Sequence, residues 1–145
     1  MLGIEASIID HACDALGGLE RAQLMQEAVL FECNRLGVRY GAGRPPPLKK
    51  PWPYMPPRHG DGEPITDVRV SISMRITVAE LMAIAAEHVD ASETLFIVGS
   101  TLAYIGRLQS RYQGVYAASP TVASESRAAL RKIKLPERYQ YNRAP

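Results

Sequence analysis

Side chains able to carry chemistry are few in this sequence, and they lie far apart. His11, Cys13 and Cys33 are residue types that bind zinc, but only the first two are close in sequence and no fourth ligand accompanies them. Ser100 and Ser119 lack the G-x-S-x-G context of a hydrolase nucleophile. No phosphate-binding glycine motif is present either. We therefore expect no catalytic site, no metal and no cofactor.

The clearest pattern in the chain lies in residues 68–76, VRVSISMRI. Apolar and polar residues alternate without exception, which predicts a β-strand with one buried face. The polar face carries Arg69, Ser71, Ser73 and Arg75. Thr77 and Glu80 have the T-x-x-E spacing of a capping box, and Ile76 and Leu81 are placed to form a hydrophobic staple. The sequence therefore predicts that a helix starts directly after the strand.

Two helices are expected after Thr77. The first is predicted to run to about Val89. Its inner side would carry Leu81, Ile84, Ala85 and His88. Either Asp90 or Ser92 is expected to cap the second helix, an apolar segment over residues 93–113.

This strand–helix–helix order resembles the ribbon-helix-helix family of DNA-binding proteins over residues 66–112. In that family, two chains pair their strands into an antiparallel ribbon that enters the major groove. The resemblance implies that Arg69, Ser71, Ser73 and Arg75 read the bases. It also implies that Ser92 and Thr94, at the start of the second helix, bind a phosphate. The segment departs from the family in its net charge of −1 and in Glu93, which lies beside the expected phosphate.

The same residues allow a different interpretation. Residues 94–98, TLFIV, are β-branched and aromatic enough to form a strand. Together with residues 68–76 and the helix between them, they would form a βαβ unit, which implies no chemistry.

The flanking residues divide into three further segments. Residues 1–38 predict a helical hairpin, with helices over residues 4–16 and 19–36. Residues 39–65 hold a proline-rich extended arm, in which Trp52 indicates docking onto another surface. Residues 113–145 form a tail with a short basic helix over residues 122–134. The predicted fold class is therefore mainly α: a helical hairpin, an extended arm, a strand–helix–helix module and an extended tail.

Basic charge lies in the two arms. Net charge is +3 over residues 39–65 and +4 over residues 113–145, against −4 for residues 1–38. Lys49 and Lys50 of the proline-rich arm are the expected further phosphate contacts. The arms would thus supply most of the attraction to nucleic acid.

Two functions remain open at this point. The first is a homodimeric or larger DNA-binding regulator or accessory factor. The second is a non-enzymatic structural subunit of a virion or larger complex, with protein partners bound through residues 42–58 and the C-terminal tail. No apolar run is long enough to span a membrane and no signal peptide is visible, so we expect a cytoplasmic or virion protein.

Overall fold

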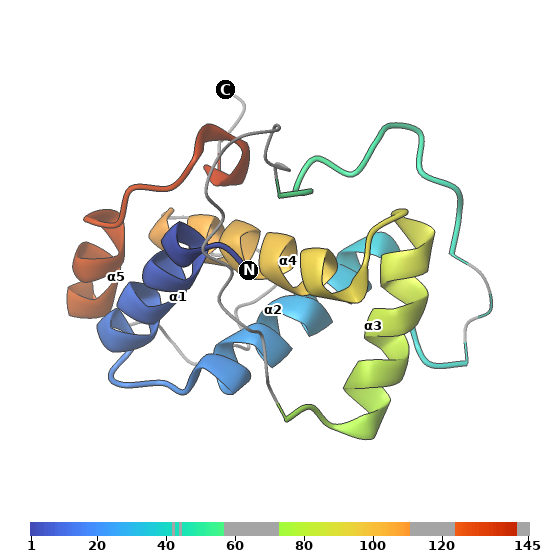
Figure 1. Ribbon diagram of the computed structural model, residues 1–145, viewed down its shortest axis with the longest axis horizontal. Helices are drawn as coiled ribbons and strands as arrows, with labels where there is room; N and C mark the ends of the chain where they lie inside the picture. Colours follow the sequence, from blue (N-terminus) through green and yellow to red (C-terminus); the bar gives the residue numbers. More distant parts are fainter. Residues whose placement is uncertain (42, 44, 57–72, 111–123, 142–145) are drawn as a thin grey trace.

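Helix α4 (Glu93–Gln109) lies at the centre of the structure, and the other described helices pack around it (Figure 1). The computed structural model describes residues 1–41, 43, 45–56, 73–110 and 124–141, with only the backbone at residues 124–127. Every residue of α4 from Phe96 to Gly106 is buried. An apolar helix covered on all sides forms the core of the fold, because it has no face left for solvent.

The N-terminal helices α1 (Gly3–Ala15) and α2 (Arg21–Leu36) confirm the predicted helical hairpin. Gly37 ends α2 in the left-handed conformation, with φ of 81°, and the N–H of Val38 donates to the carbonyl of Cys33 at 2.8 Å. Glycine adopts this conformation without a steric cost, which is why the helix stops there. The buried face of α2 carries Leu24, Met25, Ala28, Val29, Glu32, Cys33 and Leu36.

Helix α3 (Ile76–His88) begins earlier than the sequence predicted, and the strand prediction is wrong for residues 73–76. The side-chain amide of Gln26 on α2 accepts from the N–H of Arg75 at 3.1 Å and donates to the carbonyl of Ser73 at 3.5 Å. These backbone groups are therefore bonded within the chain rather than in a strand ladder. Residues 68–72, the rest of the predicted strand, lie outside the described residues.

The capping box and the staple predicted at the start of this helix are also wrong. Arg75 is the N-cap and its side chain makes no capping bond, so Thr77 lies inside the first turn. Ile76 is 78% exposed and therefore makes no staple with Leu81. Ile84 was expected on the inner side of α3, but it is 47% exposed.

In the turn between α3 and α4, an aspartate takes the left-handed conformation that glycine usually adopts. Asp90 has φ of 59°, and the N–H of Ala91 donates to the carbonyl of Ala86 at 2.9 Å, which closes the end of α3. Ser92 is confirmed as the N-cap of α4, since its Oγ accepts from the N–H of Leu95 at 3.2 Å. The alternative strand over residues 94–98 is wrong, because these residues lie in the first turns of α4.

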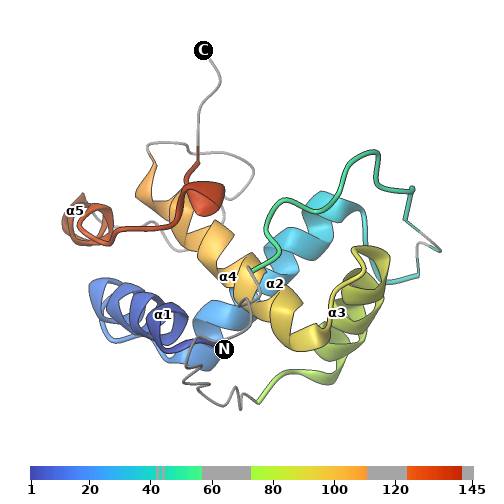
Figure 2. The ribbon, with the colours of Figure 1, turned by 45° about the horizontal axis from the view of Figure 1, so that its top comes forward.

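The C-terminal segment folds back onto the core instead of extending away from it. Helix α5 (Ser124–Arg131) lies beside α1, and the short helix η1 (Glu137–Tyr139) lies on α4 (Figure 2). Leu130, Leu135 and Tyr139 are buried there. In the described part of the chain the fold is thus mainly α, as predicted, without an extended strand. None of its helices is long and apolar enough to cross a membrane.

Candidate interaction surface

The proline-rich arm is anchored to the core of its own chain through Trp52. The Trp52 ring is 5% exposed, stacks on Phe96 with centroids 5.2 Å apart, and donates from Nε1 to Oε1 of Glu32 at 3.2 Å. Arg35 donates from Nε to the same carboxylate oxygen at 2.8 Å, so the buried charge of Glu32 has a cationic partner. Docking of the arm was expected from its tryptophan, but the surface that receives the tryptophan is intramolecular.

Two glycines of α4 allow backbone segments to cross this helix in direct contact. A Cβ on Gly99 would lie 2.2 Å from the carbonyl oxygen of Tyr54 in the arm. A Cβ on Gly106 would lie 1.9 Å from the carbonyl oxygen of Tyr139 in the tail. Both distances are far inside van der Waals contact, so only glycine fits at these two positions.

The side chain of Arg107 connects these crossing segments. Its guanidinium lies 4.9 Å from the ring centroid of Phe31 and 5.5 Å from that of Tyr141, and it donates to the hydroxyl of Tyr54 at 3.1 Å. Arg138 of the tail also donates to the carbonyl of Met55 in the arm. Helix α2, helix α4, the arm and the tail are therefore joined by one cluster of aromatic and guanidinium groups.

Residues 46–51 form a continuous exposed stretch of the arm. Lys49 and Lys50, the expected phosphate contacts, are both exposed there. A groove of about 840 Å³ separates the start of the arm from α3. It is lined by Arg39, Gly41, Gly43, Pro45, Pro47, Leu48, Ile84, Glu87 and His88. Nε2 of His88 is buried without a hydrogen-bond partner among the described residues.

The predicted base-reading residues are only partly described. Ser73 and Arg75 are exposed in the segment that precedes α3, while Arg69 and Ser71 lie outside the described residues. Ser92 and Thr94 are exposed at the start of α4, as a phosphate site requires. However, Ser92 Oγ already accepts from one of the N–H groups of that first turn, which leaves fewer donors for a phosphate.

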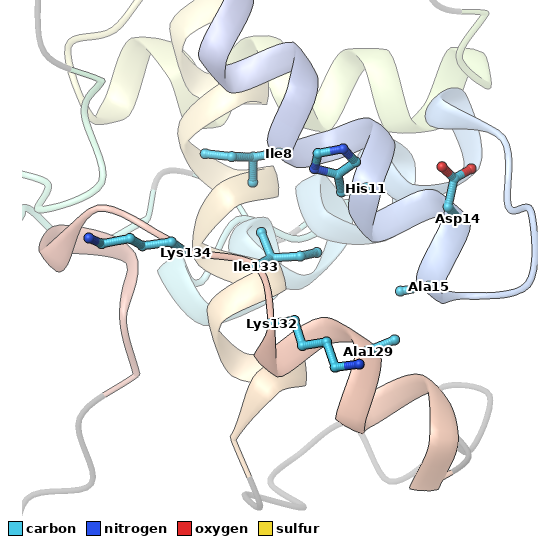
Figure 3. A pocket seen from close by; sticks show the side chains of 8 residues that line it. All are labelled: Ile8, His11, Asp14, Ala15, Ala129, Lys132, Ile133 and Lys134. Carbon is cyan, nitrogen blue, oxygen red and sulfur yellow. The ribbon is translucent and has the colours of Figure 1, made fainter.

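A second hollow, of about 540 Å³, lies between α1 and α5 (Figure 3). His11 and Asp14 lie on the α1 wall, and Lys132 lies on the opposite wall. Ile8 and Ile133 supply an apolar floor. The charged side chains that line it, Asp14, Lys132 and Lys134, are of both signs and all exposed to solvent.

The two cysteines are buried structural residues. Burial raises the pKa of the Cys13 thiol to about 11 and that of the Cys33 thiol to about 12, with the nearby carboxylates of Asp10 and Glu32 adding to the effect. Both thiols are therefore protonated at neutral pH, and they are poor nucleophiles and poor metal ligands. No group of three metal-ligating side chains occurs within the described residues.

Comparisons with family models, with curated proteins and with solved structures find no match to this chain. Sequence reasoning missed the groove, because Ile84 fits the inner spacing of an amphipathic helix and only the packed structure places it outside.

Proposed function

We propose that this protein is a self-associating assembly subunit that binds through one apolar face. We define the α3 face as Tyr40 and Leu48 at the start of the arm together with Ile76 and Ile84 on α3. Six large apolar side chains are exposed in the described part of the chain, and these are four of them. The remaining two, Ile4 and Leu30, lie on α1 and α2.

The observation that carries the proposal is that two of these exposed side chains, Leu48 of the arm and Ile84 of α3, lie together on the lining of one groove. Single exposed apolar residues are ordinary, whereas apolar residues that gather around a groove favour a binding surface. Leu48 and Ile84 line the groove between the arm and α3, and Arg39 and Glu87 give it a polar rim. An apolar centre with a polar rim is the usual composition of a protein–protein interface.

Sedimentation velocity over a concentration series tests this function. We expect the full chain to form a species larger than the monomer, and we expect Ile84→Glu to return it to the monomer. Ile4→Glu is the matched control, since Ile4 is 68% exposed but lies outside the α3 face. A chain that stays monomeric up to millimolar concentration would exclude the proposal.

DNA binding is the second candidate function. It is favoured by the exposure of Ser73 and Arg75 in front of α3 and of Lys49 and Lys50 on the arm. We expect Arg75→Ala to relax sequence preference, and changes at Lys49 or Lys50 to weaken binding to all duplexes alike. Fluorescence anisotropy with duplex DNA checks this, and the absence of binding at low salt would exclude it.

A further inference from the structure

Helix α3 carries both a projecting apolar side chain and a groove that can receive one. Ile76, at 78%, is the most exposed of the large apolar side chains in the described chain. Ile84 lies eight residues further along the helix, about 12 Å away at roughly 1.5 Å per residue, and it lines the groove against the arm. Glu80 is exposed midway between them.

We propose that two copies of this chain pair through α3 about a twofold axis at Glu80, with Ile76 of each copy seated in the groove beside Ile84 of the other. This inference rests on the proposed self-association and specifies its geometry. Ile76, Glu80 and Ile84 form one i, i+4, i+8 ridge, which is the kind of ridge that packs into the grooves of a facing helix. A twofold interface needs a self-complementary surface, and this ridge with its neighbouring groove provides one.

The groove is large enough to admit an isoleucine side chain, and part of its lining is apolar. Its volume of about 840 Å³ exceeds that of one side chain, and Pro47, Leu48 and Ile84 supply apolar walls. Ile84 and Leu48 are 47% and 38% exposed in the single chain. Seating Ile76 of the second copy in the groove would remove apolar surface of both partners from water. The twofold axis produces this contact two times in each dimer.

Charge selects the antiparallel arrangement of the two helices. Arg75 precedes α3, and Glu87 lies in its last turn. Antiparallel pairing brings Arg75 of one copy close to Glu87 of the other, and it opposes the two helix dipoles. Parallel pairing would instead place Arg75, Glu80 and Glu87 of one copy beside the same residues of the other. Each of these pairs would then bring like charges together and repel.

Glu80 is the single like-charge contact in the antiparallel arrangement. The two copies of this carboxylate meet near the axis and weaken the dimer, since like charges at short range repel even in water. We therefore expect Glu80→Gln to tighten the dimer by about threefold, and added salt to tighten the wild-type dimer more than this variant.

Disulfide trapping tests the pairing. At the axis, the Cα atoms of two facing helices come within the roughly 4.4–6.8 Å that a disulfide spans. We expect Glu80→Cys to form a covalent dimer under mild oxidation, while Cys13 and Cys33 stay buried and unreactive. Glu87→Cys is the matched control on the same exposed side of α3, because antiparallel copies of this residue lie roughly 20 Å apart.

The outcomes separate the pairing from the proposed function. Trapping at Glu80→Cys but not at Glu87→Cys supports the antiparallel pair, and trapping of both variants overturns it in favour of a parallel pair. A dimer that Ile84→Glu dissolves but Glu80→Cys does not trap overturns this geometry and leaves self-association standing. A strictly monomeric wild-type chain overturns both. Circular dichroism of each variant controls for folding.

Discussion

Nε1 of Trp52 donates to Oε1 of Glu32 at 3.2 Å, the same carboxylate oxygen that accepts from Nε of Arg35. The Glu32 side chain is only 2% exposed, so a charged group of α2 lies beneath the arm and is satisfied by it. The docked proline-rich arm therefore both buries the Glu32 carboxylate and supplies one of its hydrogen-bond donors. The only tryptophan of the chain reports on it directly.

Removal of the Glu32 carboxylate is expected to lower the stability of the folded protein. Glu32→Ala leaves Arg35 half-covered without its acid and Trp52 without its acceptor, so we expect the free energy of unfolding to fall by about 3 kcal/mol. Asp10→Ala is the control, because Asp10 pairs with Arg21 in an exposed salt bridge and should cost less than about 1 kcal/mol. Urea titrations followed by tryptophan fluorescence measure both, and equal losses would contradict the role given to Glu32.

The two glycines of α4 should respond separately to alanine. Alanine normally stabilises a helix by about 1 kcal/mol relative to glycine, but here its Cβ would strike a carbonyl oxygen. We expect Gly99→Ala to release the arm and shift the emission of Trp52 to the red. Gly106→Ala should release the tail and leave that emission largely unchanged.

Hydrogen exchange locates these two effects. Protection of the backbone amides should be lost around Trp52 in Gly99→Ala and around Tyr139 in Gly106→Ala. A variant more stable than the wild type would contradict the close backbone crossings at Gly99 and Gly106.

Stability should fall as the pH rises above about 8. The folded chain keeps protons on Cys13 and Cys33, whose pKa values are about 11 and about 12, while an unfolded thiol releases its proton near pH 8.5. The unfolded state then binds fewer protons than the folded state, so the free energy of unfolding declines with pH.

Burial also raises the pKa of Tyr139, and this acts in the same direction at still higher pH. Urea midpoints between pH 7 and pH 10 check the decline. Cys33→Ala should make it shallower even though the cavity that it creates lowers stability at every pH. A thiol assay on the folded protein at neutral pH should detect no reactive cysteine.

The turn between α3 and α4 offers a stabilising substitution. Asp90 holds φ of 59°, a conformation that costs a residue with a Cβ about 1 kcal/mol relative to glycine. We expect Asp90→Gly to raise the melting temperature by several degrees. Asp90→Ala should not raise it, because alanine keeps the Cβ that the left-handed conformation disfavours. Differential scanning calorimetry of both variants distinguishes the backbone effect from the loss of charge.

Local patterns predicted the helices of this fold well. Glycine ends α2 at Gly37, Ser92 caps α4, and apolar periodicity placed α1, α2 and α4 close to their observed bounds. The failures lie at residues 73–77, where strict alternation and a T-x-x-E spacing indicated a strand and a capped helix. A side chain from α2, Gln26, takes the backbone bonds there, and such a distant partner has no local signal.

The candidate site was less predictable than the fold. Trp52 was rightly expected to dock, yet its receiving surface depends on Glu32, Phe96 and Gly99, which come together only in the packed structure. Ile84 has the spacing of a core residue and lies outside. Burial of a residue at the edge of an amphipathic stripe depends on which neighbours reach it, and in α3 no described helix covers that edge.

The covering of α4 by the tail has a consequence for synthesis of the chain. During translation, α4 is complete before Leu135 and Tyr139, which seal its last turns, have been made. The nascent chain therefore carries α4, which is buried from Phe96 to Gly106 in the folded protein, incompletely covered until residues 135–139 have been made. A chain stalled on the ribosome between these points would expose apolar surface of α4 that the folded protein buries. Exposed apolar surface of that kind is what chaperones bind.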